Sequence, residues 1–495
     1  MTKQEAAIKY ITENYLDFNR LRHDIVSDKL QIRMEADLEG SEWFNVVQNS
    51  SELSSAEKTT LHYSTQPLHH STPCFWREMT KHDINSIVCH CAQEYDANIT
   101  SREVMTALQS DLIPDVHPLR EYINALPRYT PDQPDWIDFV AQQVRVRETS
   151  ADRPKGLSER TACCQTTMLL DRPYGAERPT NLTGEAGLTV SEAHGLTSSS
   201  SQSERSKADR LWRVCFKKWF VAMVASWMKD EVVNHQVLVL IGKQGIFKTT
   251  WLEHLIPPHL RAYACKLANS NDLNKDERLR IAEFGLISLD EIDSMNNREL
   301  NQLKSVITAT DVNERAAYAY TKERRVRLAS FCASGNRRDF LTDITGNRRW
   351  LPFEVEEIQN PFFTLLPYER MYAQAWALAQ DPLFSYWFDL DEIEVLEEHN
   401  QHFRDESNEE QLLPILFDVP AEGRGEFMTT AQISERLVTY GNIKKPMALS
   451  RLGMVLGAAG YQSTRPKIGG RLIRGWLVYQ RDTDEIASLK RLLKE

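Results

Sequence analysis

The sequence of 495 residues has no long apolar run, and its eight cysteines follow no recurring spacing. No stretch approaches the ~20 apolar residues that a membrane-crossing helix needs, so a membrane protein is not expected. The first residues, Met-Thr-Lys-Gln-Glu, lead into no apolar signal region, which argues against secretion. Cysteines without a pairing framework argue against a disulfide-rich fold. Together these absences predict a cytoplasmic protein.

A zinc site is not expected either. Cys74, Cys89, His90 and Cys91 are zinc-type ligands that lie near one another in the sequence. Their spacing lacks the C-x₂-C pair of a zinc knuckle, so we do not predict a metal centre there.

Two segments have unbalanced charge: one has few basic residues, and in the other basic residues outnumber acidic ones. Residues 354–410 carry fifteen Asp or Glu against two Lys or Arg, a net charge of -13, whereas residues 421–495 carry thirteen Lys or Arg against seven Asp or Glu, a net charge of +6. The overall net charge of -11 argues against nucleic-acid binding over the whole surface. It also conceals a basic C-terminal module. The alternative is that both segments are ordinary solvated faces.

The most informative motif follows the apolar run Val237–Ile241. That run has the pattern of a buried strand and is broken at Gly242, and a short helical segment then opens at Lys248. A strand, a glycine-bearing turn and a helix N-terminus form a phosphate-binding loop, in which backbone N–H groups and the helix dipole favour a triphosphate. In such a loop Lys248 would reach the β and γ oxygens and Thr249 would bind Mg²⁺.

One residue departs from the usual pattern of this loop. Phe247 stands directly before the lysine, where glycine is usual. We expect this bulky residue to slow turnover more than to weaken binding. The alternative is an accidental G-x-x-G turn. The residues expected to contact nucleotide are Gly242, Lys243, Gln244, Gly245, Ile246, Phe247, Lys248, Thr249 and Thr250.

A second apolar strand, residues 285–289, ends in Asp290 and Glu291. Beside a phosphate loop, Asp290 would hold Mg²⁺ and Glu291 would polarise the attacking water. The alternative is a strand followed by an acidic helix start.

A third predicted strand, residues 328–335, leads to Asn336, and residues 343–350 carry two adjacent arginines after a glycine turn. Asn336 suits a sensor of the γ-phosphate, although Asn at a strand end is also ordinary turn chemistry. Arg348 and Arg349 could neutralise charge on the nucleotide of a neighbouring subunit.

These motifs, in this order, resemble those of the virulence-associated protein E ATPases, which are relatives of the superfamily 3 helicases of viruses and mobile elements. The segment from about residue 206 to residue 355 carries the resemblance, and weaker similarity extends upstream through residues 83–87, 110–114, 117–127 and 136–139. The matching positions are Gly242, Gly245, Lys248, Thr249, Asp290, Glu291, Asn336, Gly346, Asn347, Arg348 and Arg349.

The resemblance implies an oligomeric ATPase that depends on Mg²⁺ and acts on DNA. We expect a helicase or helicase-like replication motor of a mobile element or prophage, and the family suggests a hexamer. One alternative is an ATP-binding switch or loader with slow turnover that recruits replication or defence partners to DNA. Another is a DNA-binding adaptor with a decayed motor. No primase activity is predicted, because residues 1–150 show no convincing acidic polymerase constellation.

Two segments are candidates for contacting DNA. In residues 315–327, aromatic rings could stack on bases while basic groups track phosphates, and the resemblance implies a hairpin in a central pore. The alternative is a solvated strand pair whose arginines bind nucleotide or neighbouring subunits. In this segment the predicted DNA contacts are Tyr318, Tyr320, Lys322 and Arg324.

The second candidate is the C-terminal module, which has a winged-helix pattern. Residues 427–438 and 446–457 read as helices, and residues 461–467 and 471–479 as a hairpin around Gly469-Gly470. The second helix would enter a major groove and the hairpin would grip phosphate. The alternative is a module for protein docking. The basic residues predicted on the hairpin are Arg465, Lys467, Arg471 and Arg474.

The predicted fold is therefore multidomain α/β. It has a central P-loop core of the AAA+ or superfamily 3 helicase type, a mostly helical N-terminal region and a C-terminal winged-helix-like module. In residues 1–60, a helix over 8–15 and a hairpin over 17–34 are expected, and residues 208–227 are predicted to form a core-facing helix. The predicted segments are 1–60 (uncertain, α/β), 61–149 (helical), 150–205 (flexible linker or insertion, or a loop domain), 206–355 (ATPase core), 356–410 (acidic helical connector) and 411–495 (winged-helix-like and basic).

Overall fold

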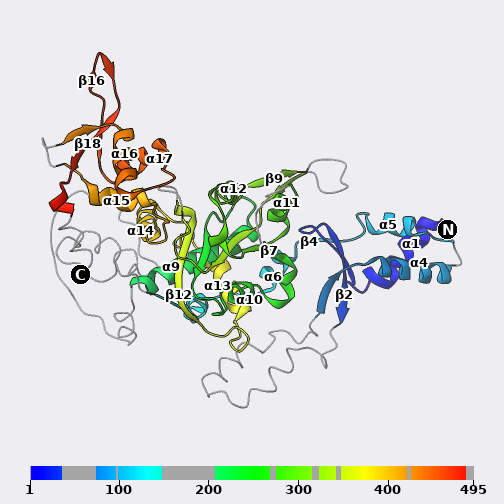
Figure 1. Ribbon diagram of the computed structural model, residues 1–495. Helices are drawn as coiled ribbons and strands as arrows, with labels where there is room; N and C mark the ends of the chain where they lie inside the picture. Colours follow the sequence, from blue (N-terminus) through cyan, green and yellow to red (C-terminus); the bar gives the residue numbers. More distant parts are fainter. Residues whose placement is uncertain are drawn as a thin grey trace, which may run out of the picture. The chain divides into compact units, whose positions relative to one another are not determined.

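The computed structural model describes residues 2–35, 74–95, 98–147, 207–267, 275–314, 323–341, 347–420 and 425–486. The fold is mixed α/β, with helices and several sheets (Figure 1). It comprises two compact units. The large unit contains Met1–Asn336 and Trp350–Ile393, and the small unit contains Arg337–Arg349 and Glu394–Glu495. The predicted linker, residues 150–205, lies outside the described residues.

A six-stranded sheet forms the centre of the large unit. Its strands run in the order β5-β12-β6-β11-β8-β7, and all neighbours are parallel except β5 and β12. Every residue of β6, β8 and β11 is buried, which accounts for the wholly apolar sequence of β6 and the mostly apolar sequence of β8. The strands are β5 Val144–Val146, β6 Val237–Ile241, β7 Ala264–Leu267, β8 Leu286–Leu289, β11 Ser330–Gly335 and β12 Trp350–Ile358.

The long helix α9 (Lys207–Met228) packs against this sheet, as its apolar spacing predicts. Its indole N–H groups reach backbone carbonyls of the sheet: Trp219 donates to Phe331 at 3.0 Å and Trp227 to Gly285 at 3.1 Å. Helices α6 (Pro118–Ala125), α7 (Trp136–Ala141) and α13 (Tyr368–Gln380) contact α9. Residues on both sides of the predicted core, 206–355, therefore help to build the large unit.

The N-terminal region is mixed rather than mostly helical. A four-stranded sheet of order β3-β2-β1-β4 accompanies its helices, and the predicted helix and hairpin of the first 35 residues are present. Its strands are too short for sequence periodicity to reveal them all, since β4 has two residues. The elements are α1 Lys3–Ile11, η1 Thr12–Leu16, β1 Leu21–Asp24, β2 Lys29–Glu35, β3 Cys74–Glu78, α4 Lys81–Tyr95, α5 Ser101–Leu108 and β4 Asp115–Val116.

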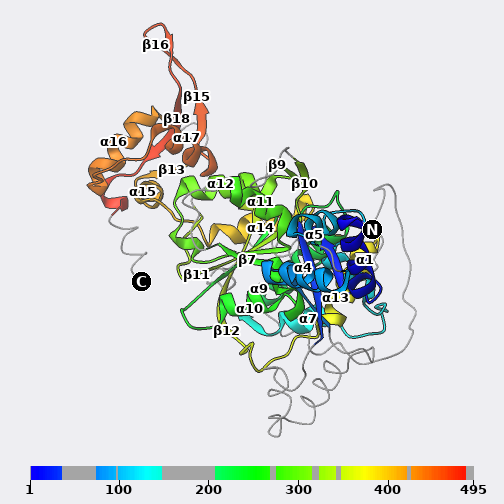
Figure 2. The ribbon, with the colours of Figure 1, turned by 90° about the vertical axis from the view of Figure 1, so that its right-hand side faces the viewer.

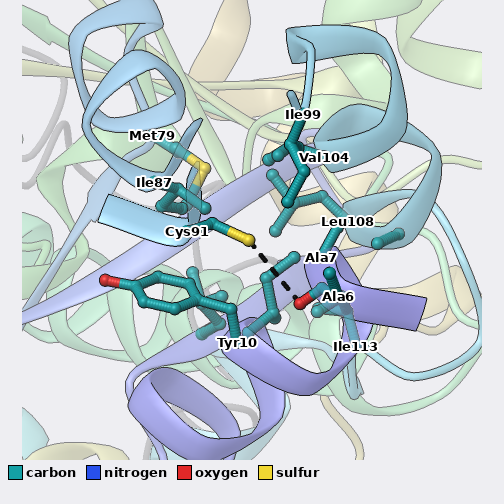
Figure 3. Close-up of a cluster of buried hydrophobic side chains, with 13 residues drawn as sticks. Ala6, Ala7, Tyr10, Met79, Ile87, Cys91, Ile99, Val104, Leu108 and Ile113 are labelled. Atoms are coloured by element: carbon teal, nitrogen blue, oxygen red, sulfur yellow. Dashed lines mark hydrogen bonds between the residues drawn. The ribbon is translucent and has the colours of Figure 1, made fainter. Parts of the chain in front are cut away.

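A separate apolar cluster holds these N-terminal helices together (Figure 3). Tyr10 of α1, Ile87 of α4 and Leu108 of α5 are among its buried members. The thiol of Cys91 donates to the carbonyl of Ala6 at 3.6 Å. This cysteine is thus a packed core residue.

The remaining elements of the large unit connect the strands of the central sheet. A β-hairpin of β9 and β10 follows α12. These elements are α10 Lys248–His254, η5 Pro258–Tyr263, α11 Lys275–Glu283, η6 Ile292–Ser294, α12 Asn297–Thr308, β9 Asp311–Glu314 and β10 Glu323–Val326.

The small unit has its own apolar core, in which Leu437, Leu452 and Trp476 are buried. Strand β18 pairs with β13, β14 and β15, and a separate hairpin of β16 and β17 projects beyond α16 and α17 (Figure 2). Its elements are η7 Asn347–Arg349, α15 Asn408–Leu416, β13 Phe417–Asp418, β14 Glu426–Met428, α16 Thr430–Gly441, α17 Leu449–Ala458, β15 Gln462–Thr464, β16 Lys467–Ile468, β17 Arg471–Leu472 and β18 Gly475–Gln480. Helix α14 (Leu390–Gln401) begins in the large unit and ends in the small one.

Across the described ranges, no helix is both long enough and apolar enough to cross a membrane.

Candidate functional site

Three parallel strands of the central sheet end at one edge, and each is followed by polar residues. Gly335 of β11 pairs with Ile241 of β6, and Ala333 pairs with Leu289 of β8. The Gly242 N–H donates to the Gly335 carbonyl at 3.1 Å. Because the carboxyl ends of parallel strands share an edge, this register brings together the loop after β6, the two acidic residues after β8 and Asn336.

The loop of residues 242–247 has an unusual backbone. Gly245 has φ 87° and Phe247 has φ 65°, both in the left-handed region, which costs a residue other than glycine about 1–2 kcal/mol. A Cβ on Gly242 would lie 2.7 Å from the carbonyl oxygen of Val355. The loop therefore needs glycine at two positions and holds Phe247 under strain. Backbone strain of this kind concentrates at functional sites.

Lys248, the first residue of α10, turns back into this loop. Its side chain is largely buried, and Nζ donates to the carbonyls of Gly242 at 2.8 Å and Lys243 at 2.7 Å. Nζ also lies 3.3 Å from Oδ1 of Asn336. Burial lowers the pKa of Lys248, and nearby Asp293 and Asp290 oppose that shift. An ammonium group is thus centred among oxygen atoms in the concave side of the loop.

Thr249 and Asp290 form a second polar cluster beside the loop. Oδ1 of Asp290 accepts from Thr249 Oγ1 at 3.2 Å and from Ser334 Oγ at 2.8 Å, while the two hydroxyl oxygens lie 2.9 Å apart. Oδ2 of Asp290 is 2.9 Å from Nζ of Lys266 in β7. Burial alone would raise the pKa of Asp290, but hydrogen bonds from Lys266, Ser334 and Thr249 hold it below its usual value. Asp290 is therefore kept ionised.

Glu291 and Asn336 lie next to this cluster. Glu291 is exposed and has φ 53°, a second left-handed residue other than glycine at this edge. The Asn336 N–H donates to Oδ1 of Asp293 at 3.2 Å. The side chain of Asn336 is exposed except for its bond to Lys248. An exposed amide thus lies beside the buried ammonium group, and an exposed carboxylate directly follows Asp290 in the chain.

The oxygen atoms around Asp290 fit a hard divalent cation. Two ligands at right angles around Mg²⁺, with bonds of about 2.1 Å, lie about 3.0 Å apart. The spacing of 3.2 Å between Thr249 Oγ1 and Asp290 Oδ1 is close to that value. Within the described ranges, no group of three or more His, Cys, Asp or Glu side chains is arranged to hold a metal ion. A cation here would need the threonine hydroxyl and further oxygens from water or ligand.

Sequence reasoning missed three residues of this edge: Ser334, Lys266 and Asp293. Ser334 sits inside the apolar run of β11, and its polarity at a buried position could have indicated a contact across the sheet. Lys266 belongs to β7, which was not predicted as a strand. Asp293 follows Glu291 in a short 3₁₀ turn whose direction is not evident from the sequence.

The two arginines predicted to act on a neighbouring subunit's nucleotide lie elsewhere in the chain than the residues that follow β6, β8 and β11. Arg348 is exposed, and Arg349 is half-buried with a pKa lowered by burial and by its neighbour Arg348. They directly precede Trp350, whose backbone pairs with Val237 at the start of β6. Trp350 thus lies at the edge of the sheet where β6 begins, whereas the loop of residues 242–247 follows its end.

The β9–β10 hairpin is described only at its base. Tyr318, Tyr320 and Lys322 lie outside the described residues. Arg324 is exposed and pairs with Asp311 at 2.8 Å. Arg327, which the sequence groups with these basic residues, is fully buried and donates to the carbonyls of Ala329 at 3.0 Å and Asn234 at 2.8 Å. It is therefore a structural residue.

The β16–β17 hairpin presents the predicted basic residues to solvent. Its turn residues Gly469 and Gly470 have φ 58° and 83°, as a two-residue turn of primed type requires. All four predicted basic side chains are exposed, and only one has a described bond, from Nε of Arg474 to Ser463 Oγ at 3.4 Å. The four are Arg465, Lys467, Arg471 and Arg474.

Helix α17 presents a different surface. Leu449 and Met454 are among its exposed residues, at 48% and 59%. Arg451 lies 3.9 Å from the carboxylate of Glu410. The hairpin therefore offers more cationic groups to a phosphate backbone than the helix does.

One comparison with known proteins matches a part of the chain. Residues 194–410 match the family model of the virulence-associated protein E-like domain. No curated protein matches the chain.

Among solved structures, the apo NrS-1 C-terminal region (305–718) aligns at 11% identity and a TM-score of 0.38, covering 96% of this chain and 99% of that one. An A-form apo structure of the same region aligns at 12% identity and a TM-score of 0.35, covering 94% and 98%. At such low TM-scores we draw no conclusion from the likeness.

Proposed function

Since residues 194–410 carry a virulence-associated protein E-like domain, we propose that the chain is a Mg²⁺-dependent ATPase that acts on DNA. In this proposal the central sheet is a P-loop core of the AAA+ or superfamily 3 helicase type, and the small unit carries a winged-helix-like module. The protein would serve as a helicase or helicase-like replication motor of a mobile element or prophage. The observation that carries the proposal is the convergence of Lys248, Thr249, Asp290 and Asn336 at one edge of the sheet.

The loop of residues 242–247 would hold the triphosphate. Lys248 Nζ already binds two loop carbonyls, and phosphate oxygens would compete with these carbonyls for the same ammonium hydrogens. A cation–phosphate contact in a mostly buried setting is stronger than one at an open surface.

Thr249 and Asp290 would hold the cation. When bound, Mg²⁺ would neutralise charge on the β and γ phosphates. Asp290 is prepared for this role, because its hydrogen bonds keep it ionised. Glu291 would orient and polarise the attacking water, and Asn336 would contact the γ-phosphate.

Arg348 and Arg349 would act on the nucleotide of a neighbouring subunit. They directly precede Trp350, which lies at the start of β12, whereas the loop of residues 242–247 follows the end of the parallel strand β6. A residue that completes the site of the next copy requires a head-to-tail interface, and such an interface closes into a ring when its rotation permits. We therefore propose a homo-oligomer, with a hexamer as the family-based expectation.

DNA contact is proposed for the two hairpins. The β16–β17 hairpin would grip duplex phosphates through Arg465, Lys467 and Arg471, and the β9–β10 hairpin would meet single-stranded DNA in a pore. The exposed apolar residues of α17 give its groove-reading role less support than the hairpin has.

The test is ATP hydrolysis by the purified protein with and without single-stranded DNA, beside the Glu291→Gln variant. We expect DNA-stimulated turnover in the wild-type protein. The variant should bind ATP normally and turn over at least about a hundredfold more slowly, since a lost general base costs about 10²–10⁴. Equal turnover in both proteins would contradict the assignment of Glu291.

A second function is favoured by one observation, the left-handed backbone of Phe247. A strained, bulky residue beside the phosphates suits an ATP-binding switch or loader with slow turnover that recruits replication or defence partners to DNA. Tight ATP binding with negligible turnover, even with DNA present, would select this function over the motor.

A further inference from the structure

Phe247 has a ring contact that its place in the loop does not explain. Its ring lies 6.3 Å from that of Phe362, at an interplanar angle of 82°. Phe362 belongs to the connection between β12 and α13, and it also meets the ring of His254 at 5.5 Å and 85°. An aromatic cluster thus adjoins both ends of helix α10.

The connection that carries Phe362 is anchored on both sides. The Gln359 N–H donates to the carbonyl of Gln143 at 2.9 Å, and the Tyr368 hydroxyl donates to the carbonyl of His254 at 2.7 Å. The Phe362 N–H donates to Oδ1 of Asn360 at 3.0 Å. The backbone that carries the ring is therefore anchored.

Despite this anchoring, the Phe362 side chain is 57% exposed. Both neighbouring rings are nearly perpendicular to it, so neither stacks in parallel on its face. Aromatic rings favour offset stacking with other flat π systems. An exposed ring on an anchored backbone, with no parallel partner among the described rings, is suited to receive a flat ligand.

The position of this ring matches the reach of a nucleotide. Phe247 directly precedes Lys248, and consecutive Cα atoms are about 3.8 Å apart. The ring of Phe247 contacts that of Phe362, so Phe362 meets the residue that directly precedes the lysine of the loop. Strand β12 continues past the last residue of β6, which places the connection at the same edge of the sheet as the phosphate loop.

We propose that Phe362 is the stacking platform for the base of the nucleotide, and that Phe247 positions it. This inference rests on the proposed function, because it assumes that the phosphates occupy the loop of residues 242–247. Stacking uses the π face that every base has, so the platform would accept adenine and guanine alike. Phe247, which stands where such a loop usually has glycine, would thus hold the platform in position.

The experiment measures binding of ATP, GTP and inorganic tripolyphosphate to the full chain with Mg²⁺ present. Phe362→Ala should weaken ATP and GTP binding roughly tenfold and leave tripolyphosphate binding unchanged, whereas Phe362→Tyr should restore nucleotide binding. The matched control is Phe363→Ala, which removes an adjacent ring that is 79% exposed and should not change binding.

The outcomes separate this proposal from the proposed function. Unchanged ATP binding in Phe362→Ala would overturn the platform, and so would an equal loss for ATP and tripolyphosphate, because a general structural defect would affect both. A wild-type protein that binds none of the three ligands would contradict the proposed function itself.

Discussion

Charged side chains occur both in the strand-end site of the large unit, which comprises the residues that follow β6, β8 and β11, and on the β16–β17 hairpin of the small unit. The two sets differ in how many neighbours hold them. At the strand ends, Lys248 and Asp290 each bond to several neighbours. On the hairpin, Arg465, Lys467 and Arg471 are exposed and form no ion pair within the described part of the chain. The charged groups at the strand ends are thus preorganised by their neighbours, whereas those of the hairpin are open to solvent.

The energetic consequences differ accordingly. A partly buried charge that interacts with several groups has a large effect when it is removed, because its partners lose compensation. An exposed charge contributes little to stability but adds to the attraction of a polyanion, and that attraction depends on salt. Substitutions in the two regions should therefore differ in magnitude and in salt dependence.

The largest expected effect is that of Lys248→Ala. Removing the ammonium group from the loop should weaken ATP binding at least about a hundredfold, as expected for a lost charge-assisted contact in a mostly buried site. Calorimetric titration with ATP and Mg²⁺ measures this loss. The control is Lys81→Ala, which removes an exposed lysine from α4 and should bind ATP like the wild-type protein. Similar ATP affinities for Lys248→Ala and the control would contradict the large effect expected for a charge of the strand-end site.

A smaller effect is expected for the hairpin. Replacing Arg465, Lys467 and Arg471 together by alanine should weaken duplex DNA binding and reduce the slope of log K against log salt by about three. Filter binding at several salt concentrations measures the slope. A matched variant replaces Arg436, Lys444 and Lys445, which are also exposed in the small unit. If both variants lose the same slope, the DNA contact is not specific to the hairpin.

The smallest effect concerns the N-terminal sheet and provides a reference outside both regions. Burial would lower the pKa of His23, but hydrogen bonds to Asp115 at 2.7 Å and Asp28 at 3.2 Å raise it above its usual value. Its stabilisation should therefore be complete below about pH 6.5 and fade as pH rises through the folded-state pKa. Thermal unfolding against pH, compared with His23→Gln, tests this. A variant with the same pH dependence as the wild-type protein would exclude His23 as the cause.

Much of the central sheet could be predicted from sequence, because its parallel strands are buried on both faces. The run Val237–Ile241 is wholly apolar and Leu286–Leu289 is apolar except for Ser288, and both strands lie where the sequence predicts them. Strand β5 could not be predicted, since it has three residues and pairs with β12, far away in the sequence. Pairing partners of this kind are set by the tertiary fold and leave no local pattern.

The candidate site shows the same division. Lys248, Thr249 and Asp290 follow from motif spacing, whereas the roles of Ser334 and Lys266 depend on the register between neighbouring strands. Arg327 shows the opposite failure, because its basic neighbours in the sequence indicate a surface residue while the fold buries it among carbonyls. Spacing identifies the residues that precede or follow a strand, but contacts across the sheet require the three-dimensional structure.

The most direct test of the proposed function is calorimetric titration of the wild-type protein with ATP, first with Mg²⁺ and then with the metal removed by chelation. We expect saturable ATP binding at one site per chain. This binding should weaken markedly without Mg²⁺, because Thr249 and Asp290 would hold the cation against the phosphates. Absence of ATP binding, or binding that does not respond to Mg²⁺, would contradict the proposed Mg²⁺-dependent ATPase.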